Sequence, residues 1–308
     1  MQGFAFLHRV ALFLCLTLFV AGDAVGAHAQ PSAVARSARS PAPAAPPDAS
    51  APRLEVDVEL VLAVDISRSM DIEELRIQRD GYVQAFRDPQ VAWAIQGGLL
   101  GRIAVLYFEW AGPGIRNVIA DWTVIDGPEA AAAFADRLAA GRITAALGTS
   151  ISGGLAFSAA QIEGNRYDGL RRVIDVSGDG PNNSGPGVEI ARDEVVAMGM
   201  TINGLPLMMK AKDGPFSLTD LDIYYEDCVI GGPQSFLLPL WDVTRFPQTI
   251  RRKLILEISG VMPEPGEGRR ARIMRAQMGY GPPKAPRIDC YIGEMLRRDW
   301  GERRGWDW

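Results

Sequence analysis

Apolar and polar positions in residues 55–262 follow two periods that alternate along the chain. Near-continuous apolar runs predict strands that are buried on both faces, at 56–65, 102–108, 172–177, 201–207 and 235–240. Between them, apolar residues recur at helical spacing, which predicts helices at 71–87, 128–140, 149–162, 188–198 and 243–258. A Gly-Pro-Gly turn at 112–114 lets 117–125 return as an antiparallel strand. We therefore expect an α/β fold: a doubly wound, mostly parallel six-stranded sheet with one antiparallel edge strand and helices on both faces.

The two ends of the chain differ from this block in composition. Residues 1–29 combine Arg9, a short apolar run at 10–20 and an A-x-A site at 27–29, which is the pattern of a secretory signal peptide. The apolar run is too short for a permanent membrane span. Residues 30–54 form a linker rich in Ala, Pro and Ser, and residues 263–308 form a tail rich in Arg and Trp. We expect an exported protein, periplasmic or secreted, without a membrane span.

Cleavage of the signal peptide would remove every histidine, because His8 and His28 are the only two in the chain. This excludes nucleophiles activated by histidine and metal sites that depend on imidazole. A general base would have to be a carboxylate, a lysine or a metal-bound water. Cys228 and Cys290 remain, and an even pair in an oxidising compartment predicts a disulfide that ties the tail to the domain. Two unpaired thiols are the alternative.

Charge is concentrated in the domain. The chain of 308 residues has a formal net charge of -5, whereas residues 55–262 hold 28 acidic and 18 basic residues, a net charge of -10. An acidic domain does not suggest nucleic-acid binding. It is compatible with a bound cation, although solubility alone would also explain it.

Oxygen-bearing side chains gather in three loops of the predicted α/β block. Asp65, Ser67 and Ser69 alternate in VDISRSMD after the first strand, Thr149 opens a helix in LGTSIS, and Asp179 follows the fourth strand in DVSGDGPNN. The carboxyl ends of parallel strands meet on one rim of a sheet, which is where α/β proteins bind ligands. Hard oxygen donors suit Mg²⁺, Ca²⁺ or Mn²⁺. The pattern therefore indicates a divalent metal site.

Each of these residues also has a plainer interpretation. Ser69 and Asp71 can cap the first helix, and Thr149 can cap its own. Asp179 can belong to an ordinary turn. Thr144 competes with Thr149 for the threonine position. The residues alone leave these alternatives open.

In this order and on these elements, the residues resemble the metal-ion-dependent adhesion site (MIDAS) of a von Willebrand factor A domain. Its pattern, D-x-S-x-S followed by a threonine and an aspartate, matches Asp65, Ser67, Ser69, Thr149 and Asp179. The segments VDISRSMD, RIAVLYFEW, VIDVSGDGPNN and INGLP also resemble a family of exported bacterial proteins with this fold and no known function. The resemblance implies that the two serines and an aspartate contact the ion, while the others often act through water.

The resemblance implies a metal-dependent protein-binding module, used in adhesion or scaffolding. Magnesium is the first expectation, with Mn²⁺ or Ca²⁺ as alternatives, and an acidic residue of a partner protein would complete the metal shell. We expect no enzyme: phosphatases of the haloacid dehalogenase type need D-x-D, and Ser67 replaces the second aspartate. A metal-dependent hydrolase, or an assembly factor in which the metal only stabilises the fold, is the alternative. The sequence leaves the oligomeric state undetermined.

Two further predictions concern Asp175 and the end of the second strand. Asp175 lies inside the fourth strand, where a charge is costly unless it is paired, and Arg171 or Arg172 is the expected partner. Glu109 and Trp110 end the second strand on the rim. They contact a partner or pack within the domain, and the sequence does not decide between the two.

Overall fold

A computed structural model describes residues 52–209, 217–261, 274–275 and 287–304 of the chain. The chain divides into two units, Met1–Ala45 and Pro46–Trp308, and the described residues all belong to the second. The expected signal peptide and most of the expected linker lie outside the described residues and stay predictions. Among the residues described, no helix combines the length and the apolar character that crossing a bilayer requires.

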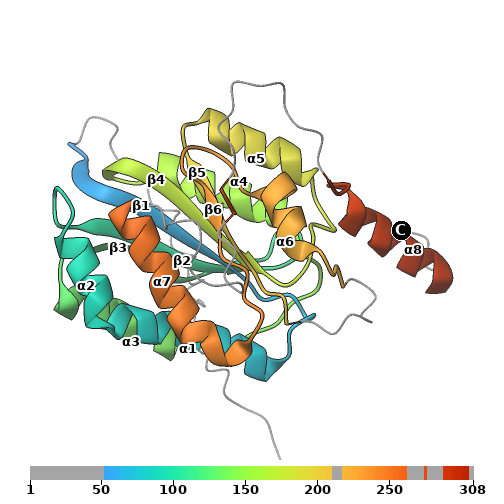
Figure 1. Ribbon diagram of the computed structural model, residues 1–308, viewed down its shortest axis with the longest axis horizontal. Coiled ribbons are helices and arrows are strands. Elements are labelled where there is room, and N and C mark those ends of the chain that lie inside the picture. The colour runs from blue at the N-terminus through green and yellow to red at the C-terminus, as the bar shows by residue number, and fades with distance from the viewer. Residues whose placement is uncertain (1–51, 210–216, 262–273, 276–286, 305–308) are drawn as a thin grey trace, which may run out of the picture. The chain divides into compact units, whose positions relative to one another are not determined.

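A single sheet with the strand order β3-β2-β1-β4-β5-β6-β7 forms the centre of this unit (Figure 1). Its strands are β1 (Leu54–Asp65), β2 (Ile103–Trp110), β3 (Arg116–Ile125), β4 (Tyr167–Gly178), β5 (Thr201–Pro206), β6 (Phe236–Leu237) and β7 (Met274–Arg275). β1, β2, β4, β5 and β6 are parallel, and β3 is antiparallel to β2 at one edge. The predicted doubly wound, mostly parallel sheet is confirmed. The two-residue strand β7, antiparallel to β6, adds a seventh strand that the sequence did not predict.

Helices cover both faces of the sheet (Figure 1). One face carries α1 (Ile72–Arg87), α2 (Pro89–Gln96), α3 (Pro128–Ala140) and α7 (Phe246–Ser259), which the 3₁₀-helix η2 (Val243–Arg245) precedes. The other carries α4 (Ile151–Glu163), α5 (Val188–Ala197), α6 (Leu221–Tyr224) and the π-helix η1 (Tyr225–Val229). Along β1, Leu62 and Val64 pack into the first layer, while Val61 and Ala63 pack into the second. Burial of both faces is why β1 is continuously apolar from Leu60 to Val64.

The boundary between β1 and α1 is fixed by a capping box. The Glu74 amide donates to Asp71 Oδ1 at 2.8 Å, and the Asp71 amide donates to Glu74 Oε2 at 2.9 Å. The predicted end of this helix before Asp88 and Pro89 is also the start of α2, because Asp88 caps a helix whose first residue is Pro89. The helix α2 is not predicted by the sequence pattern.

The predicted disulfide joins Cys228 of η1 to Cys290, two residues before α8 (Ile292–Arg304). The sulfur bridge ties part of the C-terminal tail to the domain, as expected for a protein that folds in an oxidising compartment.

A buried ion cluster lies between β4, β5 and α7, and it corrects one prediction. Asp175 pairs with Lys253, whose Nζ lies 2.8 Å from Asp175 Oδ1, and not with Arg171 or Arg172. In an extended strand, four residues span about 13 Å, so Arg171 lies too far along β4 to reach Asp175. Arg172 points to the opposite face, since successive side chains alternate.

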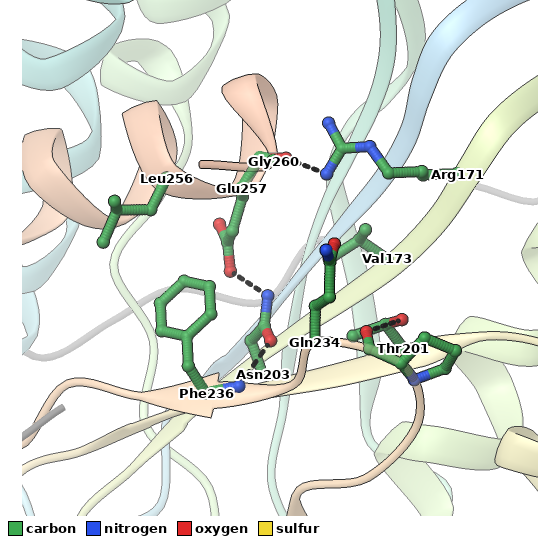
Figure 2. A pocket seen from close by; sticks show the side chains of 10 residues that line it. Arg171, Val173, Thr201, Asn203, Gln234, Phe236, Leu256, Glu257 and Gly260 are labelled. Carbon is green, nitrogen blue, oxygen red and sulfur yellow. Dashed lines mark hydrogen bonds between the residues drawn. The ribbon is translucent and has the colours of Figure 1, made fainter. Parts of the chain in front are cut away.

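Lys253 also pairs with Glu257, one helical turn further along α7. Glu257 in turn accepts a hydrogen bond from Asn203 Nδ2 at 3.0 Å. Figure 2 shows this contact beside a cavity of about 30 Å³ that is also lined by Arg171, Thr201 and Phe236. The cavity lies at the amino-terminal end of β5. It has the size of about one water molecule, which is too small for an organic ligand.

Candidate metal centre

The three loops predicted to hold a metal meet at one rim of the sheet. Asp65 is the last residue of β1, which lies between β2 and β4, where the strand order reverses. Asp179 directly follows β4, and Thr149 lies two residues before α4. This is the position at which open α/β sheets form a crevice for ligands.

Side-chain hydrogen bonds join Asp65, Ser67 and Ser69 of the first loop to Asp179 of the third loop. Asp65 accepts from the Ser67 amide at Oδ1 (2.7 Å) and from Ser67 Oγ at Oδ2 (2.9 Å). The hydroxyl oxygens of Ser67 and Ser69 are 2.8 Å apart. Ser69 Oγ donates to Asp179 Oδ1 at 2.6 Å. Residues that are far apart in the chain thus place their oxygen atoms in one continuous cluster.

The backbone of Thr149 is hydrogen-bonded to Asn183, four residues after Asp179. Its amide donates to Asn183 Oδ1 at 2.9 Å, and its carbonyl accepts from the Asn183 amide at 2.8 Å. A short parallel bridge fixes the same loop against the first one, with Arg68 N donating to Ala146 O (2.8 Å) and Ala146 N donating to Ile66 O (2.9 Å). The Thr149 loop is therefore held between the other two.

Of the plainer interpretations, the Asp71 cap is confirmed, whereas Ser69 and Thr149 do not cap the helices that follow them. Asp71 caps α1, so Ser69 is not needed as a cap and its hydroxyl contacts Asp179 instead. The N-cap of α4 is Ser150, which leaves Thr149 one residue outside the helix cap. Asp179 accepts a hydrogen bond from Ser69, 110 residues earlier in the chain.

The donor set fits a small, hard divalent cation. Two oxygens that each lie 2.0–2.1 Å from Mg²⁺ at right angles are about 3 Å apart. The oxygen pairs of Ser67–Ser69 and Ser69–Asp179, at 2.8 and 2.6 Å, are close to this spacing. Within the described ranges, no group of three or more His, Cys, Asp or Glu side chains could hold a metal. A cation here would therefore depend on the serine hydroxyls as well as the two carboxylates.

The cluster is buried except at one point. Asp65, Ser67, Thr149 and Asp179 are all at most 5% exposed, whereas Ser69 and its neighbour Arg68 are exposed. A ligand from solution would thus approach from the side of Ser69. On the side of α1, Gln78 donates to the Asp65 carbonyl at 2.9 Å.

Tyr225 and Gly178 are parts of the centre that the sequence did not indicate. A Cβ atom on Gly178 would lie 2.8 Å from the Tyr225 hydroxyl and 3.0 Å from Asp65 Oδ2, so a glycine is needed for this close approach. The Tyr225 hydroxyl is buried and has no hydrogen-bond partner among the residues described. Burial, followed by the charge of Asp65, raises the pKa of Tyr225, so the hydroxyl keeps its proton.

Glu109 and Trp110 pack within the domain. Both are buried, and Glu109 forms an ion pair with Arg79 of α1. Trp110 lies against Gly154 of α4, where an added Cβ would be 3.5 Å from the indole ring. Of the two interpretations left open by the sequence, packing is the one that the structure has.

Comparisons with solved structures return proteins with von Willebrand factor A domains. Proximal thread matrix protein 1 from the mussel byssus, with a zinc-occupied MIDAS motif, is 15% identical over 68% of this chain and 50% of its own, with a TM-score of 0.44. The von Willebrand factor type A protein from Catenulispora acidiphila is 12% identical over 66% and 43%, with a TM-score of 0.45. The pilus adhesin SpaC from Lactobacillus rhamnosus GG is 13% identical over 68% and 31%, with a TM-score of 0.46.

This chain thus spans half or less of each of these solved chains. At such TM-scores, the likeness carries no information on what this chain binds. No curated protein matches the sequence. A family model described as "Protein of unknown function (DUF1194)" matches residues 55–262, which is more than half of the chain. The chain therefore belongs to the DUF1194 family.

Proposed function

We propose that this chain is an exported, divalent-metal-dependent protein-binding module that acts in adhesion or scaffolding. One observation supports it above the others: Ser69 of the first loop and Asp179 of the third share a 2.6 Å hydrogen bond within a cluster of hard oxygen donors. The disulfide between Cys228 and Cys290 agrees with export to an oxidising compartment.

In this proposal, Ser67, Ser69 and Asp179 hold the ion, while Asp65 and Thr149 orient the cluster. Because Asp65 Oδ2 accepts the Ser67 hydroxyl proton, the lone pairs of Ser67 Oγ are turned toward Ser69 and Asp179. The bound cation, Mg²⁺ first and Mn²⁺ or Ca²⁺ as alternatives, supplies a positive centre with an open position. Because Asp179 is the one carboxylate that contacts the ion in this proposal, beside neutral hydroxyls, such a centre keeps a net positive charge and attracts a further carboxylate.

The partner would supply this carboxylate from an Asp or Glu side chain. Arg68, exposed next to Ser69, adds a positive charge on the open side of the site. Leu147 is 71% exposed two residues before Thr149, and its carbonyl accepts from the Gly112 amide at 3.1 Å, which fixes it on the same rim. An acidic residue beside an apolar one would match this combination of charge and apolar surface.

A peptide array tests this function directly. Each acidic peptide is printed beside its amide counterpart, with Asn for Asp or Gln for Glu. The array is probed with the mature protein in Mg²⁺, with the same protein in EDTA, and with Asp65→Ala in Mg²⁺. We expect binding to acidic members alone, and only for the wild type in Mg²⁺.

Binding that persists in EDTA, or that does not distinguish an acid from its amide, would contradict the proposed function. We also propose that the site binds rather than catalyses. Hydrolysis of phosphate or carboxylate esters by the pure protein, lost in Asp65→Ala, would overturn that part and favour a metal-dependent hydrolase.

A further inference from the structure

The described part of the tail, residues 287–304, contacts the loop that carries Asp179. We call residues 179–184 the third loop. Glu294 Oε1 of α8 accepts a hydrogen bond from Asn182 Nδ2 at 2.6 Å. The Arg297 guanidinium donates a second hydrogen bond, at 3.3 Å, to the carbonyl oxygen of Asn183. The tail therefore reaches the third loop only a few residues after the candidate metal ligand.

The first turn of α8 lies against the third loop without space for a side chain. A Cβ atom added to Gly293 would overlap with the Asn182 carbonyl oxygen and would lie 3.1 Å from Pro181. Gly293 is buried, and glycine is a poor helix former. A glycine at this helical position is thus explained by the close approach of the two backbones.

Asn182 connects the tail to the rest of the centre. It is fully buried, and its Oδ1 accepts from the Ser152 amide (3.1 Å) and the Ser152 hydroxyl (3.3 Å) in the first turn of α4. The backbone amide of Asn182 donates to the Tyr224 hydroxyl at 3.1 Å. The Asn182 side chain, which donates to Glu294, therefore also fixes the third loop against the start of α4, next to Thr149.

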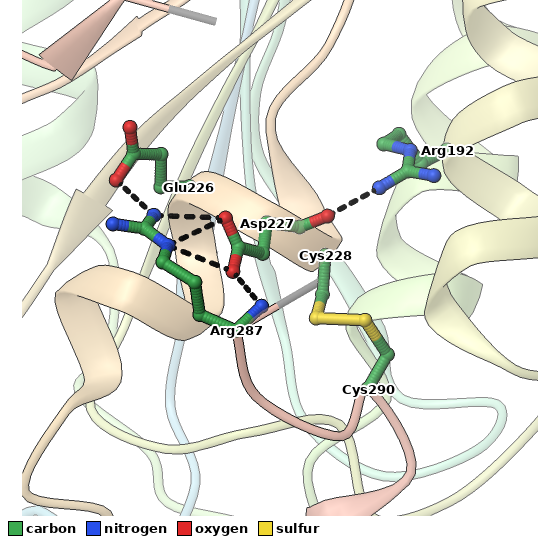
Figure 3. A network of polar contacts seen from close by, with 6 residues as sticks. All are labelled: Arg192, Glu226, Asp227, Cys228, Arg287 and Cys290. Atoms are coloured by element: carbon green, nitrogen blue, oxygen red, sulfur yellow. Dashed lines mark hydrogen bonds and ion pairs between the residues drawn. A yellow bond between two sulfur atoms is a disulfide. The ribbon is translucent and has the colours of Figure 1, made fainter. Parts of the chain in front are cut away.

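The tail is anchored on η1, directly after Tyr224. Figure 3 shows Arg287 between Glu226 and Asp227, beside the disulfide of Cys228 and Cys290. The Arg287 guanidinium lies 2.8 Å from Asp227 Oδ1. One short helical turn thus carries both the covalent and the ionic attachment of the tail, and its position places α8 on the third loop.

We propose that Glu294 and Gly293 of the tail are positioning residues of the metal centre, acting through Asn182 to hold the loop that carries Asp179. This inference rests on the proposed metal site. It extends the centre beyond the family-matched block, which ends at residue 262, to a segment held by the disulfide.

The test compares four variants of the full mature chain by calorimetric titration with Mn²⁺. Glu294→Ala removes the hydrogen-bond acceptor, and Glu294→Gln keeps an acceptor oxygen without the charge. Asp299→Ala removes an exposed carboxylate from the same helix and serves as the matched control. Gly293→Ala improves helix propensity but introduces the overlap with Asn182.

We expect Glu294→Ala to weaken Mn²⁺ binding roughly tenfold, the lower end of the range for groups that orient metal ligands. Gly293→Ala should weaken it as well, although it favours the helix. Glu294→Gln and Asp299→Ala should bind Mn²⁺ like the wild type. Equal weakening by Glu294→Gln and Glu294→Ala would show an effect of charge and would overturn positioning, as would wild-type affinity in Glu294→Ala.

Amide hydrogen exchange in EDTA separates this inference from the proposed function. In the metal-free protein, residues 180–184 should exchange faster in Glu294→Ala and Gly293→Ala than in the wild type or Asp299→Ala. Absence of Mn²⁺ binding by the wild type would sink the proposed function. Unchanged exchange in both α8 variants would overturn the positioning role, whatever the metal result.

Discussion

The hydroxyl oxygen of Ser69 lies 2.6 Å from Oδ1 of Asp179, although 110 residues separate them in the chain. Two residues after Ser69, the carboxylate of Asp71 caps α1. The segment VDISRSMD therefore contains both features that its sequence suggested, a set of metal-type oxygens and a helix cap, on different residues. Because the cap belongs to Asp71, the serine is available to the cluster on the rim.

Substitution of Ser69 and of Asp71 should separate these two roles. Saturation with Mg²⁺ at a hundred times its Kd should stabilise the wild type by about 2.7 kcal/mol. Ser69→Ala should lose most of this gain, because one donor is missing. Asp71→Ala should lower the stability by about 1 kcal/mol through the lost cap but keep the gain. Thermal unfolding with Mg²⁺ and with EDTA measures both effects, and a lost metal response in Asp71→Ala alone would contradict the assignment.

The buried ion cluster predicts a pH dependence of stability. Burial, followed by the Asp175 carboxylate, raises the pKa of Glu257 from 4.5 to about 7. A raised folded-state pKa means that the folded protein binds this proton more tightly than the unfolded chain does. The stability contributed by the group is therefore fully present below pH 4.5 and is lost as the pH rises through about 7.

Glu257→Gln should remove this dependence, because the amide keeps an acceptor for Asn203 and has no proton to lose. Relative to the wild type, the free energy of unfolding of the variant should rise by on the order of 3 kcal/mol between pH 5 and pH 8. Urea unfolding in EDTA at both pH values measures the difference without a contribution from bound metal. A difference that does not change with pH would contradict this account.

Lys253 is the one cation within this cluster, as far as the described residues show, and it is fully buried between two carboxylates. Lys253→Met should lower the free energy of unfolding by roughly 3–5 kcal/mol, because it leaves buried carboxylates without their partner. The exposed pair of Arg76 and Glu73 is the matched control: Arg76→Ala should cost at most about 1 kcal/mol. Denaturant unfolding of both variants checks the contrast, and equal losses would argue against the buried pairing.

The disulfide should contribute substantially to stability. It closes a chain segment of 62 residues, for which the loop-entropy relation gives about 4 kcal/mol. The double variant Cys228→Ser with Cys290→Ser should therefore unfold at lower denaturant, and the reduced wild type should behave like it. Chemical unfolding with and without reductant measures this. Equal stability of the oxidised and reduced wild type would mean that the two sulfurs are not joined in the folded protein.

The main strands and helices could be predicted from the sequence because their signals are local. β1 shows as an apolar run and α1 as a capped, periodic segment, and both lie within two residues of their expected bounds. The pattern does not show α2, because Asp88 and Pro89 end one helix and begin the next. The strand β7 contributes only two residues and has no periodicity to detect.

The partners of buried groups depend on long-range packing, and the sequence indicated them poorly. The oxygens of Ser67, Ser69 and Asp179 could be predicted to meet because strand ends of a parallel sheet share a rim. Lys253 could not be predicted as the partner of Asp175, since the two residues are 78 positions apart in the chain. The position of Tyr225 near Asp65 could not be predicted either, because it depends on how η1 packs.

We propose that Asp65, Ser67, Ser69, Thr149 and Asp179 form a divalent metal site. Calorimetric titration of Mg²⁺ and Mn²⁺ into the metal-stripped mature protein, beside Asp65→Ala, tests it most directly. We predict one site in the wild type and none in the variant, since Asp65 orients Ser67 through two hydrogen bonds. Equal binding by both proteins, or no binding of either ion by the wild type, would contradict the claim.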